Sequence, residues 1–173
     1  STTTATNYLS FLAAPLNIRR APLHVILDLG CTRPMGSWAA IKAFMKEAWK
    51  FGITVKIVPT WSKFTFADSK TTQCWRALWV QFPTDPPTST QFDIVEEGTV
   101  PILFSLGQMR NLGFKLDLRP EGSYLTCEAF GFARTLLPTS TSGHLIVDLG
   151  KIRFSPSGSS TFQASGLPAT ACA

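Results

Sequence analysis

The chain has 173 residues, of which 45% are hydrophobic and 16% charged, a composition that suits one folded domain with flanking segments. Its net charge of +5 is scattered, so a basic stripe for nucleic acid is not expected. No apolar run approaches the roughly 18 residues that a transmembrane helix needs. The twelve Gly, twelve Pro and thirteen Phe favour a β-rich domain with many loops over a helical bundle.

The four cysteines, Cys31, Cys74, Cys127 and Cys172, are far apart in the sequence and form no C-x-x-C motif. With only two histidines in the chain, a zinc site is not expected, and no motif calls for another cofactor. Two disulfides remain an alternative, but free buried thiols in a reducing compartment are the favoured interpretation.

Composition divides the chain into an N-terminal arm (residues 1–21), a folded domain (22–154) and a low-complexity C-terminal tail (155–173). The first residue is Ser rather than Met, which predicts a processed form or a fragment. Residues 1–27 contain no acidic residue, as at the end of an organelle-targeting segment or in an extended arm. The compartment is not fixed by these signals; an intracellular location is expected, with an organelle as one alternative. The N-terminal arm is expected to dock on its own domain or on another chain, and the C-terminal tail on a partner.

The first half of the domain begins with an apolar strand over residues 23–29. Ser37 is a suitable N-cap, and apolar residues at helical spacing predict a helix over 37–51 that ends at Gly52. A strand is expected over 54–58. Residues 64–82 then read as a hairpin with Asp68-Ser69-Lys70 at its tip. Trp75 and Trp79 share one face of the second arm, where we expect packing in the core or against a partner.

The second half is predicted as a loop over 83–90 followed by strands and one short helix. Ser105 is expected to cap that helix, over about 106–112, and Gly113 to end it. The expected strands are 92–95, 101–104, 114–118 and 124–129. The heptad at 144–150, with Asp148, closely matches the heptad at 24–30. It is interpreted as the last strand of a single lobe, with a duplicated lobe as the less favoured alternative.

Two stretches carry a family resemblance. In the first, Val25-Ile26-Leu27 runs into Asp28-Leu29-Gly30, an apolar strand that ends on a carboxylate and a turn. In the second, the apolar run from Val100 to Phe104 leads into the helix capped by Ser105. Together they resemble the core of the retropepsin-like aspartic proteases of retroviruses and retrotransposons. The resemblance implies a mainly β domain, a closed β-barrel lobe with one inserted helix.

The resemblance assigns Asp28 as the catalytic carboxylate and places Leu29 and Gly30 in the active-site turn. The hairpin with Asp68, Ser69 and Lys70 at its tip corresponds to the flap that closes over substrate. Aspartic proteolysis needs two carboxylates that share a proton, one as general base and one as acid. Because a retropepsin-type chain supplies a single Asp, activity requires a homodimer with the site on the two-fold axis.

Leu29 departs from the family, which has Thr or Ser at this position. The family hydroxyl ties the two active-site turns together, and Leu leaves its polar partners unpaired, at a cost of about 1–3 kcal/mol each. The tip of the hairpin also lacks the usual Gly. In the alternative interpretation, the Asp28 carboxylate only caps its own turn through backbone N–H groups.

Two functions are therefore open. The first is a retrotransposon-type aspartic endopeptidase, or its domesticated descendant, that acts on polypeptides as a homodimer. The second is a catalytically silent relative that serves as a structural or binding subunit of a larger assembly through its arms. A Ser-His-Asp site built from Ser105, His144 and Asp148 is a remote third candidate, because no spacing supports it.

Overall fold

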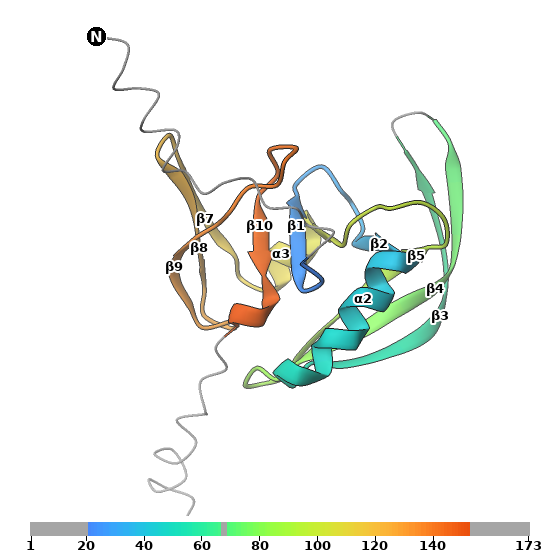
Figure 1. Ribbon diagram of the computed structural model, residues 1–173, viewed down its shortest axis with the longest axis horizontal. Helices are drawn as coiled ribbons and strands as arrows, with labels where there is room; N and C mark the ends of the chain where they lie inside the picture. The colour runs from blue at the N-terminus through green and yellow to red at the C-terminus, as the bar shows by residue number, and fades with distance from the viewer. Residues whose placement is uncertain (1–20, 67–68, 153–173) are drawn as a thin grey trace, which may run out of the picture.

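A seven-stranded sheet and a three-stranded sheet make up most of the structure (Figure 1). The computed structural model describes residues 21–66 and 69–152, so the predicted tail and all but the last residue of the predicted arm lie outside it. The elements in chain order are β1 (His24–Asp28), β2 (Met35–Ser37), α2 (Trp38–Ala48), η2 (Trp49–Phe51), β3 (Thr54–Thr65), β4 (Thr71–Phe82), β5 (Thr88–Val95), β6 (Leu103–Ser105), α3 (Leu106–Asn111), β7 (Lys115–Arg119), β8 (Gly122–Cys127), β9 (Phe132–Leu136), β10 (Ile146–Asp148) and η3 (Leu149–Lys151).

The larger sheet has the strand order β10-β1-β6-β2-β5-β4-β3, and the smaller sheet has the order β7-β8-β9. The prediction of a mainly β fold with an inserted helix is confirmed, with α2 as that helix. Neither sheet closes on itself within the described residues, so the closed barrel is not confirmed.

Strand β1 lies inside the larger sheet because both of its edges are paired. It runs parallel to β6, with Asp28 opposite Ser105, and antiparallel to β10, with His24 opposite Asp148. Side chains alternate between the two faces of a strand. Val25 and Leu27 accordingly lie in the main core, whereas Ile26 faces away from it.

Helix α2 forms where its apolar residues recur at helical spacing. The Ser37 hydroxyl accepts a hydrogen bond from the Ala40 N–H at 3.3 Å, which satisfies one of the free donors at the helix start. Ile41 and Phe44 are fully buried against the larger sheet. The chain leaves the following turn η2 through Gly52, whose φ of 71° is in the left-handed region that favours glycine. Figure 1 shows α2 crossing strands β3 to β5.

One hydrophobic core joins the two sheets. Phe92 and Phe104 stack inside it with their ring centroids 5.5 Å apart. Phe130, which follows β8, packs edge-on against Phe82 at 5.0 Å and so connects the smaller sheet to β4. The phenylalanines that suggested a β-rich domain are thus the contacts that hold its two sheets together.

Two predicted boundaries are wrong. The strand expected over 54–58 and the hairpin expected over 64–82 form one continuous hairpin, β3–β4, because a register irregularity between Pro59 and Ser62 lets pairing continue past the proline. The loop expected over 83–90 ends earlier, since β5 begins at Thr88 and pairs with β4. Pairing with β4 overrides the loop tendency of Thr88-Ser89-Thr90.

Replacing Ser105 tests the cap that starts α3. The Ser105 hydroxyl accepts from the Gln108 N–H at 3.3 Å, and Gln108 Oε1 accepts from the Ser105 N–H at 3.2 Å. We expect Ser105→Ala to lower the free energy of unfolding by about 1 kcal/mol in urea titrations. Ser89→Ala, on the exposed surface of β5, should change it by less than about 0.5 kcal/mol. Equal effects of the two substitutions would contradict the capping role.

Candidate active site

The turn at Asp28 ends strand β1 at the surface. The carboxylate Oδ1 of Asp28 accepts a hydrogen bond from the Gly30 N–H at 2.9 Å, and the Asp28 carbonyl accepts one from the Cys31 N–H at 3.2 Å. The turn thus has the local geometry that the capping interpretation predicted. A carboxylate held by one backbone N–H at a half-exposed position also remains accessible to a second group from outside.

Leu29 is 53% exposed, at the surface beside the Asp28 carboxylate. Within one chain, the Leu29 side chain leaves no buried polar group without a hydrogen bond. The cost expected from its missing hydroxyl therefore arises only where a second chain meets this turn. A Cβ added to Gly30 would lie 3.4 Å from the Asp28 carboxylate oxygen, so space alone does not require glycine there.

The second Asp-Leu-Gly sequence, at Asp148, forms the same kind of turn. Its Oδ1 accepts from the Gly150 N–H at 2.9 Å, as Asp28 does from Gly30. The two leucines differ, because Leu149 is fully buried in the main core whereas Leu29 is exposed. An identical local sequence therefore has a packing role at one end of β1 and is left at the surface at the other.

The two turns lie at opposite ends of β1. Because β1 and β10 are antiparallel, Asp148 pairs with His24, four residues before Asp28. Four residues of strand span about 13 Å. Asp28 and Asp148 of one chain are therefore too far apart to share a proton, so a carboxylate pair at Asp28 needs a second chain.

The β3–β4 hairpin extends on the same side of the molecule as the Asp28 turn, at the upper end of the view in Figure 1. Near its tip, the Ser69 N–H donates to the Phe66 carbonyl at 2.9 Å, and the Phe66 N–H donates to the Lys70 carbonyl at 3.0 Å. Ser69 has a φ of 64°, so a serine adopts the left-handed backbone conformation that favours glycine. The predicted tip residue Asp68 lies outside the described residues.

Apolar contacts connect this hairpin to the loop that follows Asp28. Phe64 and Cys74 of the hairpin form a small cluster with Met35 and Val95, and Cys31 packs against it. Arg33, in the same loop, pairs with the buried carboxylate of Asp93 at 3.1 Å. These contacts fix the part of the hairpin near its tip relative to the loop that follows Asp28.

The tryptophans of the hairpin are not core residues. Trp75 is 52% exposed and packs edge-on against Trp61, which is 70% exposed. Trp79 is half-buried beneath the Lys56 ammonium, 4.7 Å from the ring centroid. The core alternative for these residues is therefore wrong, and packing against a partner stays a prediction.

Glu96 and the three members of the Ser-His-Asp alternative each have other partners. Arg76 binds Glu96 through two 2.8 Å hydrogen bonds, which hold the pKa of that carboxyl below its usual range. Ser105 caps α3, His144 Nδ1 hydrogen-bonds the hydroxyl of Ser142, and Asp148 faces His24. The structure thus gives the proposed Ser-His-Asp members separate partners.

Three cysteines lie in the described part of the chain, and all three are free thiols: Cys31, Cys74 and Cys127. Burial, followed by the charges of Asp93 and Glu96, raises the pKa of Cys74 to about 11. The fourth, Cys172, is outside the described residues.

Within residues 21–66 and 69–152 no three potential ligands gather for a metal ion, and no helix there is long and apolar enough to cross a membrane.

Sequence reasoning missed a pocket of about 390 Å³ that lies over the face of β1 turned away from the main core. His24 and Ile26 line it, and by alternation Asp28 belongs to the same face of the strand. The pocket brings together residues from four distant segments, so no local pattern signals it.

The His24 ring gives the fold a pH dependence that can be measured. Burial lowers the pKa of His24, and Lys151 lowers it further, while Asp148, 3.6 Å from Nε2, partly opposes the shift. In the unfolded chain the imidazole has its ordinary pKa of about 6.5. Below neutral pH the unfolded chain therefore binds more protons than the folded chain. We expect the free energy of unfolding to decrease as the pH falls through 6.5.

The check is urea unfolding at several pH values between about 7.5 and 5.5. We expect the free energy of unfolding to change less steeply with pH in His24→Gln than in the unmodified chain. His144→Gln removes the other histidine and serves as the matched control. Parallel curves for the unmodified chain and His24→Gln would contradict the assignment of this slope to His24.

Comparisons of this chain with protein-family models, with curated proteins and with solved structures found no match. The candidate site therefore stands on its own arrangement. It consists of one accessible carboxylate at the end of a doubly paired strand, an exposed leucine beside it, and a long hairpin on the same side of the molecule.

Proposed function

We propose that this chain is one half of a homodimeric aspartic endopeptidase of the retropepsin type, with Asp28 from each subunit forming the catalytic pair. The observation that carries the proposal is the position of the two Asp-Leu-Gly turns. The accessible one, at Asp28, has no carboxylate partner within reach from Asp148, so two copies of the same turn are what would complete a pair.

The pairing of β1 with β6 supports the same assignment. The two stretches that resemble the retropepsin core lie side by side and parallel, with Asp28 opposite Ser105 at the start of α3. The hairpin that resembles the flap extends toward the same end of the molecule (Figure 1). Its Phe64 and Cys74 belong to the cluster against which Cys31, in the loop after Asp28, packs. The proximity of these three segments supports the proposal.

In such a dimer the two carboxylates would lie close enough to share one proton. The ionised one removes a proton from a water molecule as it attacks the peptide carbonyl carbon, and the protonated one donates to the carbonyl oxygen. The pair titrates as a unit, so the pH dependence of cleavage reports apparent pKa values of the pair. The Gly30 N–H already holds one oxygen of Asp28 and fixes its orientation.

The proposal includes a retropepsin-like closed barrel as the fold of the domain. Its support is the shared core, since Leu125 and Phe132 of the smaller sheet belong to the same hydrophobic cluster as Val25 and Leu27 of β1. A polypeptide would be the substrate, held between the Asp28 turn and the hairpin.

A catalytically silent structural subunit is the second candidate, and Leu29 favours it. The exposed isobutyl group lies where two copies would meet, and it offers no hydroxyl for bonds across the two-fold axis. The exposed Trp61 and Trp75 add a surface suited to a partner protein. Either a larger complex or a homodimer would cover these side chains.

The decisive test compares the full chain with two matched Asp substitutions. Purified protein, at a concentration where sedimentation shows a dimer, is assayed against a diverse peptide library from acid to neutral pH. We expect cleavage by the unmodified chain and a loss of about 100-fold or more in kcat/KM for Asp28→Asn. Asp148→Asn changes the equivalent turn at the far end of β1 and should retain cleavage.

Absence of cleavage by a chain that is dimeric and folded would exclude the peptidase and leave the silent subunit. Equal losses in the two Asn variants would point to a folding defect, which circular dichroism of each variant detects independently. Cleavage that survives Asp28→Asn unchanged would assign the activity to another group.

Leu29 can be tested through dimer affinity. Leu29→Thr restores the hydroxyl of the family pattern, and Leu29→Val has the same shape without it. If the turns meet at a two-fold axis, the Thr variant should form the dimer about threefold to tenfold more tightly than the Val variant, since one hydrogen bond contributes about 1 kcal/mol. Sedimentation equilibrium measures both constants. Identical constants would show that this turn is not at a subunit interface.

A further inference from the structure

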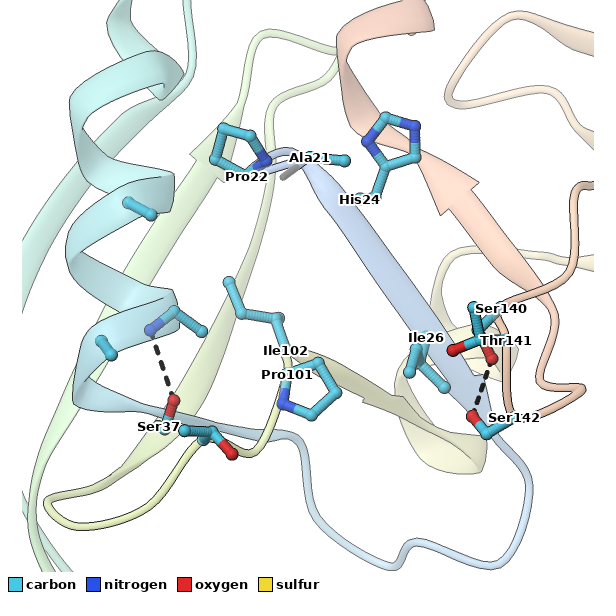
Figure 2. Close-up of a pocket in the computed structure, with 14 residues that line it drawn as sticks. Ala21, Pro22, His24, Ile26, Ser37, Pro101, Ile102, Ser140, Thr141 and Ser142 are labelled. Carbon is cyan, nitrogen blue, oxygen red and sulfur yellow. Dashed lines mark hydrogen bonds between the residues drawn. The ribbon is translucent and has the colours of Figure 1, made fainter. Parts of the chain in front are cut away.

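The pocket over β1 is a trough formed by four segments of the chain. Figure 2 shows the start of helix α2, with Ser37, on one side and the loop with Ser140 and Ser142 on the other. Ile26 and Ile102 lie between these two sides and form the floor. Its volume of about 390 Å³ is within the range of sites that hold ligands or side chains.

The polar groups on the walls are largely satisfied by the fold itself. The Ser37 hydroxyl accepts from the Ala40 N–H, and the Ser140 hydroxyl accepts from the His144 N–H at 3.1 Å while it also pairs with Ser142. What the trough offers to an occupant is therefore chiefly apolar surface from isoleucine, proline and alanine side chains. A charged small molecule would find no counter-charge on these walls except His24.

His24 adds one specific requirement. Its Nε2 lies 3.6 Å from a carboxylate oxygen of Asp148. Its Nδ1 is buried without a hydrogen-bond partner among the described residues. A suitable occupant brings apolar side chains together with a polar group that can hydrogen-bond the imidazole.

We propose that the N-terminal segment of this same chain, residues 8–16, occupies the trough. The chain enters the described structure at Ala21 and Pro22, and both residues line the pocket. The segment Tyr8-Leu9-Ser10-Phe11-Leu12-Ala13-Ala14-Pro15-Leu16 is uncharged and rich in large apolar side chains, and it also carries hydroxyl donors. This proposal does not rest on the peptidase function, since it needs no reaction at Asp28.

Chain length makes the docking feasible. Leu16 is five residues before Ala21, and five extended residues reach about 17 Å. A segment tethered at the mouth of its own site has an effective concentration in the millimolar range, so modest contacts are enough to fill the site. The C-terminal segment 153–173 is less suited, because Ser, Gly, Ala, Thr and Pro dominate it and its large apolar side chains are few.

The first experiment maps the contact by cross-linking in the full chain. A small diazirine amino acid replaces Ala43, which lines the trough, or Lys46, one turn further along α2 and outside the pocket. After irradiation, mass spectrometry of mixed normal and isotope-labelled chains separates links within a chain from links between chains. We expect Ala43 to link to residues 8–16 of its own chain about tenfold more than Lys46 does.

Links from Ala43 to a second copy, links to residues 153–173, or no excess over Lys46 would each overturn the proposal. The first result would assign the trough to a subunit interface and the second to the other end of the chain.

A second experiment fills the trough instead of probing it. Ala43→Trp should displace the segment and expose the bonds after Tyr8, Phe11 and Leu12 to chymotrypsin, so that initial cleavage there is about tenfold faster than in the unmodified chain. Lys46→Trp places the same side chain outside the pocket and should leave the rate within about twofold. Unchanged cleavage in a folded Ala43→Trp variant would overturn the proposal, and the cross-linking result stands even if that variant does not fold.

Discussion

The double pairing of β1 is the constraint on which the rest of the arrangement depends. Its five residues are held by β6 on one edge and β10 on the other, so the strand cannot slide without moving Val25 and Leu27 out of the core. The same strand register decides which residues lie on the opposite face of β1, where Ile26 lines the trough. It also delivers Asp28 to the surface at the end of the strand.

The repeated Asp-Leu-Gly sequence illustrates how position changes the role of a motif. Both turns close with the same backbone hydrogen bond to the Asp carboxylate. Leu149 completes the core, whereas Leu29 remains exposed, because the two turns follow strands that run in opposite directions in the sheet. The peptidase proposal and the silent-subunit alternative differ in what covers Leu29.

The hairpin and α2 are connected through charge as well as apolar contact. Arg76 of β4 binds Glu96 and also lies 4.3 Å from the centroid of the Trp38 ring at the start of α2. Arg33 links the loop after Asp28 to Asp93 of β5. Surface ion pairs add little individually, but these bonds set the orientation of the elements around the candidate site.

The sequence by itself determined the local elements whose signals are strong and short-range. Ser37 and Ser105 cap helices, Gly52 ends a helical segment with a positive φ, and the apolar run before Asp28 forms a strand that ends in an Asx turn. These features depend on residues within a few positions of one another, so their patterns can be read directly.

Only the tertiary structure decided how far strands extend and which segments meet. The pairing that carries β3 past Pro59 and begins β5 at Thr88 comes from neighbouring strands. The trough over Ile26, the exposure of Leu29 and the separation of the two Asp turns likewise depend on strand order and direction. No local pattern contains that information, because each of these features joins residues that are distant in the chain.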